Sequence, residues 1–382
     1  MRWSMKRIPN VDDRAKILVV SAVGMGNAIL FIPALRRLRT HFRHAHIVLL
    51  VFLKPAKELF EICPYVDEVQ YLPFRTKDFG VLVKVLLRLW TRRFDISMIT
   101  FPAPRIHYNL ISLLSGARVR IAHKYRDRNL ATLNILNTAR VEIEDVHDID
   151  QNFNLLRPLG ISPEDGDRRL ELWLNSDDIS SADRFLERSR IDSDDFVVGI
   201  HPGCTENQPW KRWPYRYFAK LADLLISSCG AKVLLFIGPD ELDAETEIVS
   251  WMKKKPVVVR RLPIREAAAV VRRCTVFVSN DSGIMHIAEA LNIPTFGIFG
   301  PSDYVRMAPY RSLEWVIRQD FECSRECAHA LSKLGHRFHC IRGENVCLTG
   351  LMPDQVFRVL EKFLASTRSG RGVKGICRRE MR

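Results

Sequence analysis

The sequence predicts an α/β protein with two Rossmann-like domains, whose parallel sheets face each other across a cleft. Short apolar runs of strand length alternate with stretches of helical period, and this alternation occurs in each half of the chain. Almost wholly apolar strands between helices are typical of parallel sheets that are covered on both faces. The length of 382 residues is enough for two domains with separate cores.

The first half contains four candidate strands. They are the apolar runs at 16–21, 46–52, 66–72 and 94–100, and the clearest helices between them are 27–42 and 79–92. We therefore place an N-terminal Rossmann-like domain at 1–175.

The second half contains five candidate strands. They are 196–201, 232–238, 256–260, 276–278 and 295–299, with helices near 215–227, 242–254 and 264–273. They define a second Rossmann-like domain at 176–352, followed by a C-terminal helix and basic tail at 353–382. Residues 142–195 are acidic and irregular, which suits a linker. Because open parallel sheets bind ligands beyond the carboxyl ends of their strands, a shared ligand would lie in the cleft.

The formal net charge of +14 implies an acidic partner, such as nucleic acid, anionic lipid or a phosphorylated substrate. The Lys and Arg residues are scattered, and no zinc-finger, RNA-binding or basic-zipper pattern is present, so nucleic acid is not expected.

The basic tail after Thr367 suits an anionic membrane surface. No apolar run approaches the roughly 18 residues of a membrane span, and the first residues lack the apolar core of a signal peptide. We expect a cytoplasmic protein, peripheral at the inner face of the cell membrane.

Four of the nine cysteines lie close together in the sequence. Cys323, Cys327, Cys340 and Cys347 have three histidines between them, so a zinc site is one interpretation. The loose spacing lacks the paired cysteines of zinc knuckles and favours reduced cysteines in a compact loop. A disulfide framework is not expected in the cytosol.

Three loops that follow candidate strands carry polar residues suited to a substrate. After the strand at 276–278, Asn280 and Asp281 favour a turn, and Ser282 and Gly283 open a helix. The unpaired backbone N–H groups of such a helix start form an anion site. The alternative is an ordinary turn in which Asp281 or Ser282 caps the helix.

The other two loops follow the first strand of each half. The segment 24–27 (Gly-Met-Gly-Asn) brings backbone close to a substrate, although a tight turn would use the same glycines. It lacks the third glycine of the dinucleotide fingerprint, and no phosphate loop of the ATPase type is present. Lys211 and Arg212, between Trp210 and Trp213, would aim positive charge at a phosphate. The alternative is a solvated basic turn with Trp213 packed on the next helix.

Taken together and in this order, the three loops resemble glycosyltransferase family 9, whose best-known members are the lipopolysaccharide heptosyltransferases. The resemblance extends from about Lys16 to Phe363, and four further segments match that family: 66–69, 94–96, 114–118 and 300–303. It implies a GT-B fold, a nucleotide-sugar donor held mainly by the second domain and an acceptor held mainly by the first. It also implies inversion at the anomeric carbon, without an essential metal or a cofactor.

The resemblance also implies roles for individual residues. Those implied for the donor, an ADP-heptose-like nucleotide sugar, are Thr205, Lys211, Glu241, Asp281, Ser282, Gly283 and His286. Those implied for a phosphorylated glycolipid or glycan acceptor are Gly24, Gly26, Asn27 and Arg105. Glu241 would hydrogen-bond the ribose, or else complement the dipole of the helix that it begins. Lys211 and the amides at Ser282 and Gly283 would stabilise the departing diphosphate in place of a metal.

Asn27 departs from the family. Heptosyltransferases commonly have Asp at this position, where it is taken to be the general base, and an amide cannot accept a proton at neutral pH. Asn27 can therefore orient an acceptor but cannot deprotonate it. His107, after the fourth strand, is the candidate base; the alternative is a partly buried helix histidine. The expected catalytic residues are thus Asn27, His107 and Lys211.

The sequence favours an inverting, metal-independent transferase that moves heptose or a related sugar onto lipopolysaccharide or another cell-envelope glycan. One alternative is a transferase of the same fold with a different donor and acceptor. The other is a catalytically silent protein that binds sugar nucleotides or glycans.

Overall fold

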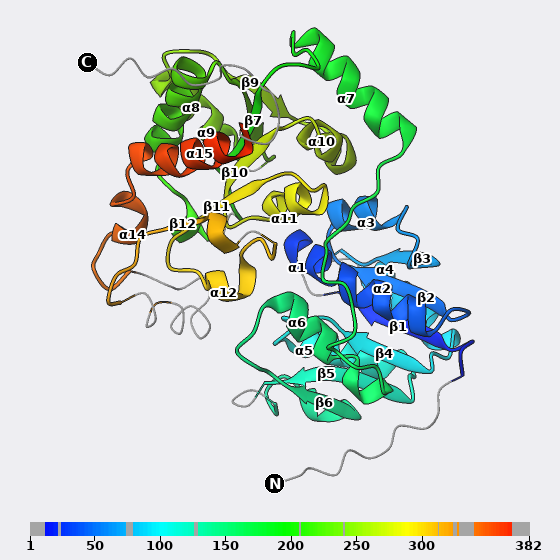
Figure 1. The fold of residues 1–382 in the computed structure, drawn as a ribbon. Coiled ribbons are helices and arrows are strands. Elements are labelled where there is room, and N and C mark those ends of the chain that lie inside the picture. Colours follow the sequence, from blue (N-terminus) through cyan, green and yellow to red (C-terminus); the bar gives the residue numbers. More distant parts are fainter. Residues whose placement is uncertain are drawn as a thin grey trace. The chain divides into compact units, whose positions relative to one another are not determined.

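The computed structural model describes residues 12–21, 24–73, 79–125, 129–205, 208–239, 241–311, 313–323, 327 and 340–368. The chain divides into two compact units, Met1–Trp173 and Leu174–Arg382 (Figure 1). Each unit is built around one parallel sheet, with helices on both of its faces.

The first unit contains a six-stranded sheet in the order β3-β2-β1-β4-β5-β6. Its strands are β1 (Lys16–Val20), β2 (His46–Val51), β3 (Glu68–Tyr71), β4 (Ile96–Ile99), β5 (Val119–Lys124) and β6 (Ala139–Glu142). All pairings are parallel, and the central strand β1 places Lys16 opposite His46 and Ile17 opposite Ile96. Its helices are α1 (Met25–Leu30), α2 (Ile32–His41), α3 (Lys54–Phe60), α4 (Phe79–Thr91), α5 (Ile106–Leu114) and α6 (Asp148–Asn154), with 3-10 helices η1 (Asn134–Leu136) and η2 (Arg157–Leu159).

The second unit repeats this strand order as β9-β8-β7-β10-β11-β12. Its strands, all parallel, are β7 (Val197–His201), β8 (Lys232–Ile237), β9 (Val257–Arg260), β10 (Val276–Asn280), β11 (Thr295–Phe299) and β12 (Val316–Arg318). Its helices are α7 (Ser176–Arg188), α8 (Tyr215–Cys229), α9 (Leu242–Trp251), α10 (Ile264–Val271), α11 (Gly283–Ala290), α12 (Tyr304–Met307), α14 (Val346–Thr349) and α15 (Pro353–Arg368), with 3-10 helices η3 (Pro209–Lys211) and η4 (Leu313–Trp315). Both units thus have the doubly wound order of a Rossmann domain, which confirms the fold class.

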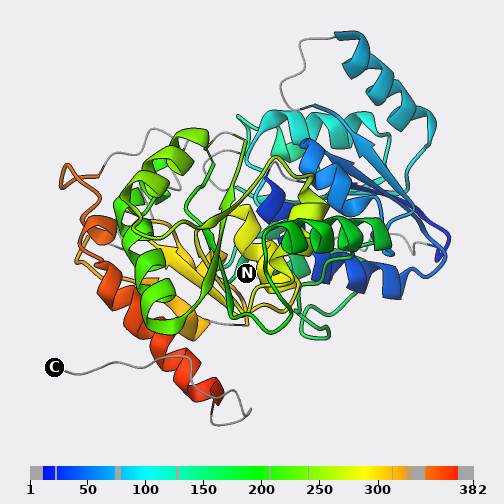
Figure 2. The same ribbon diagram turned by 90° about the horizontal axis from the view of Figure 1, so that it is seen from above.

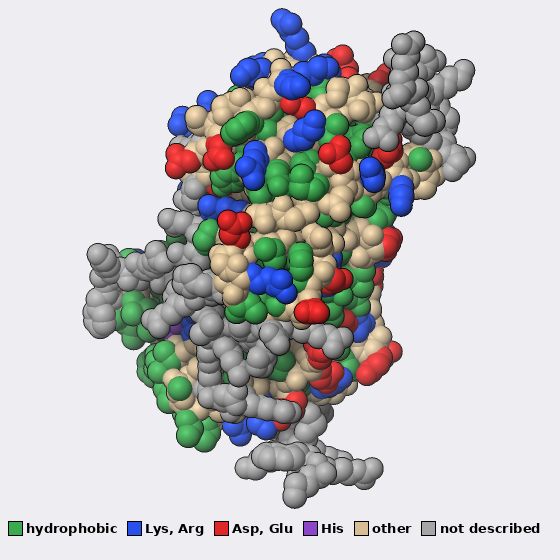
Figure 3. Space-filling view, turned by 90° about the vertical axis from the view of Figure 1, so that its left-hand side faces the viewer, with side chains coloured by type: hydrophobic (Ala, Val, Ile, Leu, Met, Phe, Trp, Pro, Cys, Tyr) green, Lys and Arg blue, Asp and Glu red, His purple; other side chains and the backbone are tan. Residues whose placement is uncertain are grey.

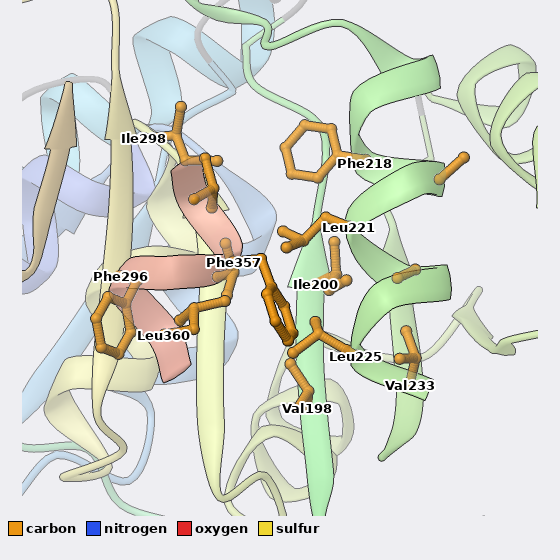
Figure 4. Packing of buried hydrophobic residues seen from close by; sticks show 14 of the residues in the cluster. Val198, Ile200, Phe218, Leu221, Leu225, Val233, Phe296, Ile298, Phe357 and Leu360 are labelled. Atoms are coloured by element: carbon orange, nitrogen blue, oxygen red, sulfur yellow. The ribbon is translucent and has the colours of Figure 1, made fainter. Parts of the chain in front are cut away.

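The C-terminal helix α15 is part of the core of the second unit. Its Phe357 and Leu360 pack with Leu221 of α8 and Ile200 of β7, and all four side chains are almost wholly buried (Figure 4). Burial of each such side chain contributes about 1.5–3 kcal/mol, so α15 stabilises the sheet that carries the second unit's loops. The basic tail, from residue 369 onward, lies outside the described residues.

The stretch 142–195 was predicted to be an irregular linker; the boundary between the two units, after Trp173, lies within it, but the prediction that it is irregular was wrong. It contains α6 and α7, and α7 begins with a reciprocal cap in which Asn175 and Asp178 each accept a hydrogen bond from the other's backbone N–H, at 2.8 and 3.0 Å. Ala182 and Leu186, one turn apart, are buried where α7 packs on α10. Because charged side chains cover the rest of α7, its apolar face was too narrow to be recognised in the sequence.

The helix expected at 27–42 is two helices, α1 and α2, separated at Phe31. Pro33 is the second residue of α2, and a proline can begin a helix but cannot continue one, because it has no N–H and its ring clashes with the preceding turn. The strands β5, β6 and β12 were not predicted.

Basic side chains are spread over the surface. On the face shown in Figure 3, Lys and Arg alternate with Asp and Glu instead of forming one continuous patch. None of the described helices is long and apolar enough to cross a membrane.

Candidate functional site

The residues selected from the sequence lie where ligands bind in this strand order. In each unit, the first and fourth strands are neighbours, β1 beside β4 and β7 beside β10. The connections after these strands run to opposite sides of the sheet, which opens a crevice at the carboxyl ends. The segment 24–27 follows β1, and Arg105 and His107 follow β4. In the second unit, Lys211 follows β7 and residues 281–283 follow β10.

Asn280, at the end of β10, holds the loops of the second unit together. Its side chain is fully buried, its Nδ2 donates to the carbonyl of Pro202 at 2.6 Å, and its Oδ1 accepts from the backbone N–H of Trp213 at 3.2 Å. Trp213 is itself fully buried, and its indole N–H donates to the carbonyl of Leu351 at 2.9 Å. Asn280 therefore fixes both ends of the loop that carries Lys211. The sequence had suggested only a turn-forming role for it.

Lys211 and Asp281 form a buried ion pair at the start of α11. The Nζ of Lys211 lies 2.6 Å from Oδ2 of Asp281, and the two side chains are 13% and 3% exposed. The ammonium also lies 5.4 Å from the centre of the Trp210 ring, within range of a cation–π interaction. The structure thus brings together two residues that the sequence assigned to the donor, and it shows that each holds the other in place.

The first turn of α11 is not capped by a side chain. Ser282 is the N-cap residue, but it makes no capping hydrogen bond, and its hydroxyl lies 2.9 Å from that of Ser279. The backbone N–H groups that begin the helix therefore point toward the same edge of the sheet as Lys211. His286, in the next turn, is 1% exposed, so its ring belongs to the interior of the unit.

Glu241, at the start of α9, faces the loop after β7. It is buried, its Oε2 accepts from the backbone N–H of Gly238 at 3.0 Å, and it lies 3.9 Å from Nδ1 of His201. A Cβ on Gly203 would come within 1.6 Å of Oε1 of Glu241, so only glycine fits there. Neither His201, the last residue of β7, nor Gly203, two residues beyond it, was selected from the sequence.

Two other residues of the loop after β7 add to the charge and shape of the site. Although partial burial lowers the pKa of Arg212, the neighbouring Cys204, Tyr215 and Glu241 raise it overall, so its guanidinium stays charged. Thr205 is exposed at the edge of the described part of this loop.

In the first unit, Gly24 has a φ of +124°, a conformation that favours glycine. A Cβ at this position would lie 3.0 Å from the side-chain nitrogen of Asn27. Gly26 and Asn27 are in the first turn of α1, and Asn27 is partly exposed. The side-chain amide of Asn27 therefore packs directly against the backbone of Gly24, which has no side chain in the way.

The loop between β4 and α5 is held by two hydrogen bonds. The N–H of Phe101 donates to Oδ1 of Asn152 at 2.9 Å, and that of Ala103 donates to the hydroxyl of Tyr125 at 2.6 Å. The loop ends at Arg105, the exposed N-cap residue of α5. His107 is the second residue of α5, so these two hydrogen bonds of the preceding loop also fix its position.

His107 is half-buried and is held neutral at neutral pH. Burial, and then the charge of Arg105, lower the pKa of its imidazole below the ordinary value of 6.5. Its ring centre lies 6.2 Å from that of Phe52 and 4.1 Å from that of Tyr108. Its imidazole is therefore neutral, as a general base must be. Its position, partly buried on a helix, is also the one expected of a histidine with only a packing role.

Arg105 and His107 line one cavity of about 710 Å³ in the first unit. Gly24, Gly26 and Asn27 are not among the residues that line it. The structure therefore places the candidate base beside Arg105, while Asn27 follows the neighbouring strand.

The four clustered cysteines do not form a recognisable metal site. Cys323 and Cys327 pack against Trp210. Burial, and then the neighbouring Cys323, Cys340 and Cys347, raise the pKa of Cys327 to about 11, so its thiol is protonated. Within the described part of the chain, no three His, Cys, Asp or Glu side chains are placed to hold a metal ion. The three intervening histidines lie outside that part.

Comparison with known proteins places this geometry in one family. The model of glycosyltransferase family 9 (heptosyltransferase) matches residues 105–336. Lipopolysaccharide heptosyltransferase 2 of Salmonella typhimurium is 26% identical over 316 residues, which cover 79% of this chain and 88% of that protein. Lipooligosaccharide heptosyltransferase 2 of Campylobacter jejuni is 28% identical over 172 residues, 44% of this chain, and the match spans only 51% of that protein.

A solved structure shows the same fold. The glycosyl transferase family 9 protein from Veillonella parvula superimposes with a TM-score of 0.76 at 22% identity, covering 94% of this chain and 99% of that one. The two Rossmann-type units thus form a GT-B architecture, as expected. The family match covers more than half of the chain. The chain belongs to glycosyltransferase family 9, the heptosyltransferase family.

Proposed function

We propose that this protein is an inverting, metal-independent glycosyltransferase. It moves heptose or a related sugar from an ADP-heptose-like donor to a phosphorylated lipopolysaccharide or cell-envelope glycan acceptor, at the inner face of the cell membrane. Family membership supports sugar transfer, and the second unit's site supports the nucleotide diphosphate as its leaving group.

The Lys211–Asp281 pair at the start of α11 carries the proposal. A nucleoside diphosphate gains negative charge as its bond to the sugar breaks, and an uncapped helix start beside an ammonium group stabilises that charge. Asp281 keeps Lys211 oriented, while the guanidinium of Arg212 adds a second positive charge nearby. Glu241, fixed by Gly238 and fitted against Gly203, is placed to accept hydrogen bonds from the ribose hydroxyls.

The acceptor side of the reaction belongs to the first unit. The acceptor hydroxyl attacks the anomeric carbon of the donor sugar from the side opposite the diphosphate, and the carbon–oxygen bond to the diphosphate breaks. The proton of the hydroxyl passes to the neutral imidazole of His107, and the electron pair of the broken bond leaves with the diphosphate. Asn27 orients the acceptor, and Arg105 binds its phosphate.

The test is a transfer assay with a panel of nucleotide sugars and phosphorylated glycan acceptors. Donor binding is read first as a rise in melting temperature, since a ligand at 100 times its Kd adds about 2.7 kcal/mol of stability. The proposal expects a glycosylated acceptor whose new bond has the opposite anomeric configuration to the donor. Binding of a nucleotide sugar without turnover on any acceptor would favour the silent binding protein. Transfer from a nucleotide sugar other than ADP-heptose would favour the first alternative, in which the protein is a transferase of the same fold that uses a different donor and acceptor.

A further inference from the structure

The helix α4 is apolar around nearly its whole circumference, yet little of it is buried. It contains no Asp or Glu, and its charged residues are Lys84 and Arg88. Among its described side chains, at 80–91, only Leu89 is buried, while Leu87 and Trp90 are 55% and 62% exposed. A helix of this composition is ordinarily enclosed, so α4 is suited to contact with further apolar material. Figure 2 shows it at the outer edge of the first unit, at the upper right.

Between α4 and α5 lies the cavity of about 710 Å³, which we call the α4–α5 pocket. Leu82 and Leu86 of α4 line one side, and Leu110 and Leu114 of α5 line the other. Apart from Arg105, His107 and Thr132, the side chains recorded in its lining are apolar. The volume is that of a small-molecule site, but the wall offers almost no hydrogen-bonding groups to a sugar or a peptide.

The pocket opens to solvent along α5. Ile106 and Leu114 both line it and are 44% and 46% exposed, so an apolar chain can enter without unfolding the helix. Arg105 stands next to Ile106, at the amino end of α5. Neither α4 nor α5 contains an acidic residue that would repel an anion there.

We propose that the α4–α5 pocket binds the hydrocarbon chain of the acceptor, and that Arg105 binds the acceptor's phosphate at the mouth of the pocket. The hydrocarbon part of the acceptor, and not only its sugar and phosphate, then contacts the protein. This inference rests on the proposed function, because it assigns a binding pocket to one part of the acceptor of the same transferase.

The apolar wall explains why a chain is favoured over other occupants. Burial of a hydrocarbon chain needs only apolar contacts, and these are what Leu82, Leu86 and Leu110 provide. The single guanidinium at the mouth matches the single phosphate of an amphiphile. Lys84 and Arg88, on the helix beside the pocket, extend the positive charge toward an anionic lipid surface.

The first experiment measures binding of alkyl phosphates by calorimetry, below the concentrations at which they form micelles. Each added methylene should tighten binding about fourfold, the factor that corresponds to about 0.8 kcal/mol per buried CH2, until the pocket is full. Inorganic phosphate alone should bind far more weakly. An affinity that does not change with chain length would overturn the proposal.

The second experiment compares two adjacent residues of α5. Leu114→Glu places a charge in the pocket wall, whereas Leu113→Glu places the same charge on a side chain that is 37% exposed and does not line the pocket. Both positions are partly exposed, so both variants should fold, and circular dichroism checks this. We expect Leu114→Glu to weaken binding of dodecyl phosphate at least tenfold and Leu113→Glu to leave it nearly unchanged. Equal loss in both variants would instead indicate general adsorption to lipid, and no loss in either would remove the pocket from the site.

A third measurement separates this inference from the proposed function. Transfer is assayed on an acylated acceptor and on the same acceptor after deacylation. We expect a lower KM for the acylated form, and Leu114→Glu should abolish that advantage, whereas Leu113→Glu should leave it in place. Equal KM values for the two acceptors would refute the lipid pocket while leaving sugar transfer intact. Chain-dependent binding without transfer to either acceptor would refute the proposed function while leaving the pocket intact.

Discussion

At the scale of single residues, Glu289 is a carboxylic acid with almost no access to water. It lies in the last turn of α11, it is 5% exposed, and its Oε1 accepts from the backbone N–H of Arg311 at 2.9 Å. Burial raises its pKa from 4.5 to about 7. The folded protein therefore holds a proton that the unfolded chain has already released, in the window between these two values.

This proton makes the stability of the second unit depend on pH. Because the folded state binds more protons than the unfolded state between pH 4.5 and about 7, the contribution of Glu289 falls as pH rises through that window. The slope is at most about 1.4 kcal/mol per pH unit. Glu289→Gln should remove this slope, which denaturant unfolding at about pH 5 and about pH 8 measures. If wild type and variant lose stability equally over that range, Glu289 is not protonated in the folded protein.

His107 makes a prediction about activity. If it is the base, the rate should fall at low pH with a midpoint below 6.5, because burial and Arg105 both disfavour the imidazolium. His107→Gln should remove that limb of the pH–rate profile and cost roughly 10²–10⁴ in rate. Full activity with an unchanged profile would show that His107 is only a packed helix residue.

Two variants sharpen the test of His107. Arg105→Gln removes one of the two causes of its lowered pKa, so the acidic limb should move to higher pH. Asn27→Asp introduces a carboxylate where heptosyltransferases commonly have one. Combined with His107→Gln, Asn27→Asp should restore part of the rate if residue 27 lies beside the acceptor hydroxyl. The acidic limb of the pH–rate profile should then lie at lower pH, because a carboxylate has a lower pKa than an imidazole.

At the scale of elements, the loop after β7 depends on a glycine. Gly203→Ala would place a methyl group within 1.6 Å of the carboxylate of Glu241, and the buried neighbours of Glu241 leave it little room to move. We expect the alanine variant to lose nucleotide affinity, measured by calorimetry with ADP. Gly203→Ala combined with Glu241→Ala removes the overlap and should regain stability but not affinity. Unchanged ADP binding in Gly203→Ala would show that this contact lies outside the donor site.

The sequence predicted most elements of both sheets, because strands buried on both faces form continuous apolar runs. It missed β6 and β12, which have only four and three residues, and β5, whose apolar run is interrupted by Arg120 and His123. It also missed α7, whose buried face is narrow. The anion-binding start of α11 was recognisable from local turn chemistry. The function of Asn280 was not, because its partners Pro202 and Trp213 lie more than 60 residues away in the chain. Local sequence patterns thus predicted where the loops begin and end. They did not predict that the side chain of Asn280 connects two of these loops.

The ion pair shows a second limit of sequence-based prediction. The sequence indicated Lys211 only as a positive charge aimed at a phosphate. The structure pairs it with Asp281, whose carboxylate is 3% exposed, so Lys211→Ala alone leaves a buried charge without its partner. Removal of one partner of a buried pair costs about 3–5 kcal/mol, which a simple activity measurement would not separate from catalysis.

At the scale of the whole molecule, the proposed transferase stabilises its leaving group with protein cations and amides. Excess EDTA should therefore leave the transfer rate unchanged. Circular dichroism must be followed in the same samples, because the cysteines near Trp210 would be affected by loss of any bound metal. Loss of activity in a folded protein, with rescue by magnesium or manganese, would contradict metal independence.

The most direct test of the central claim is a double-mutant cycle on kcat/KM for the nucleotide-sugar donor, with unfolding measured in parallel. The four proteins are wild type, Lys211→Ala, Asp281→Asn and the double variant. In the double variant neither residue leaves an unpaired charge, so stability should return close to that of wild type. If Lys211 stabilises the departing diphosphate, the stable double variant should still lose about 2–4 kcal/mol of transition-state stabilisation, a rate loss of roughly 10²- to 10³-fold. A double variant as active as wild type would contradict the claim that the diphosphate leaves against Lys211 at the start of α11.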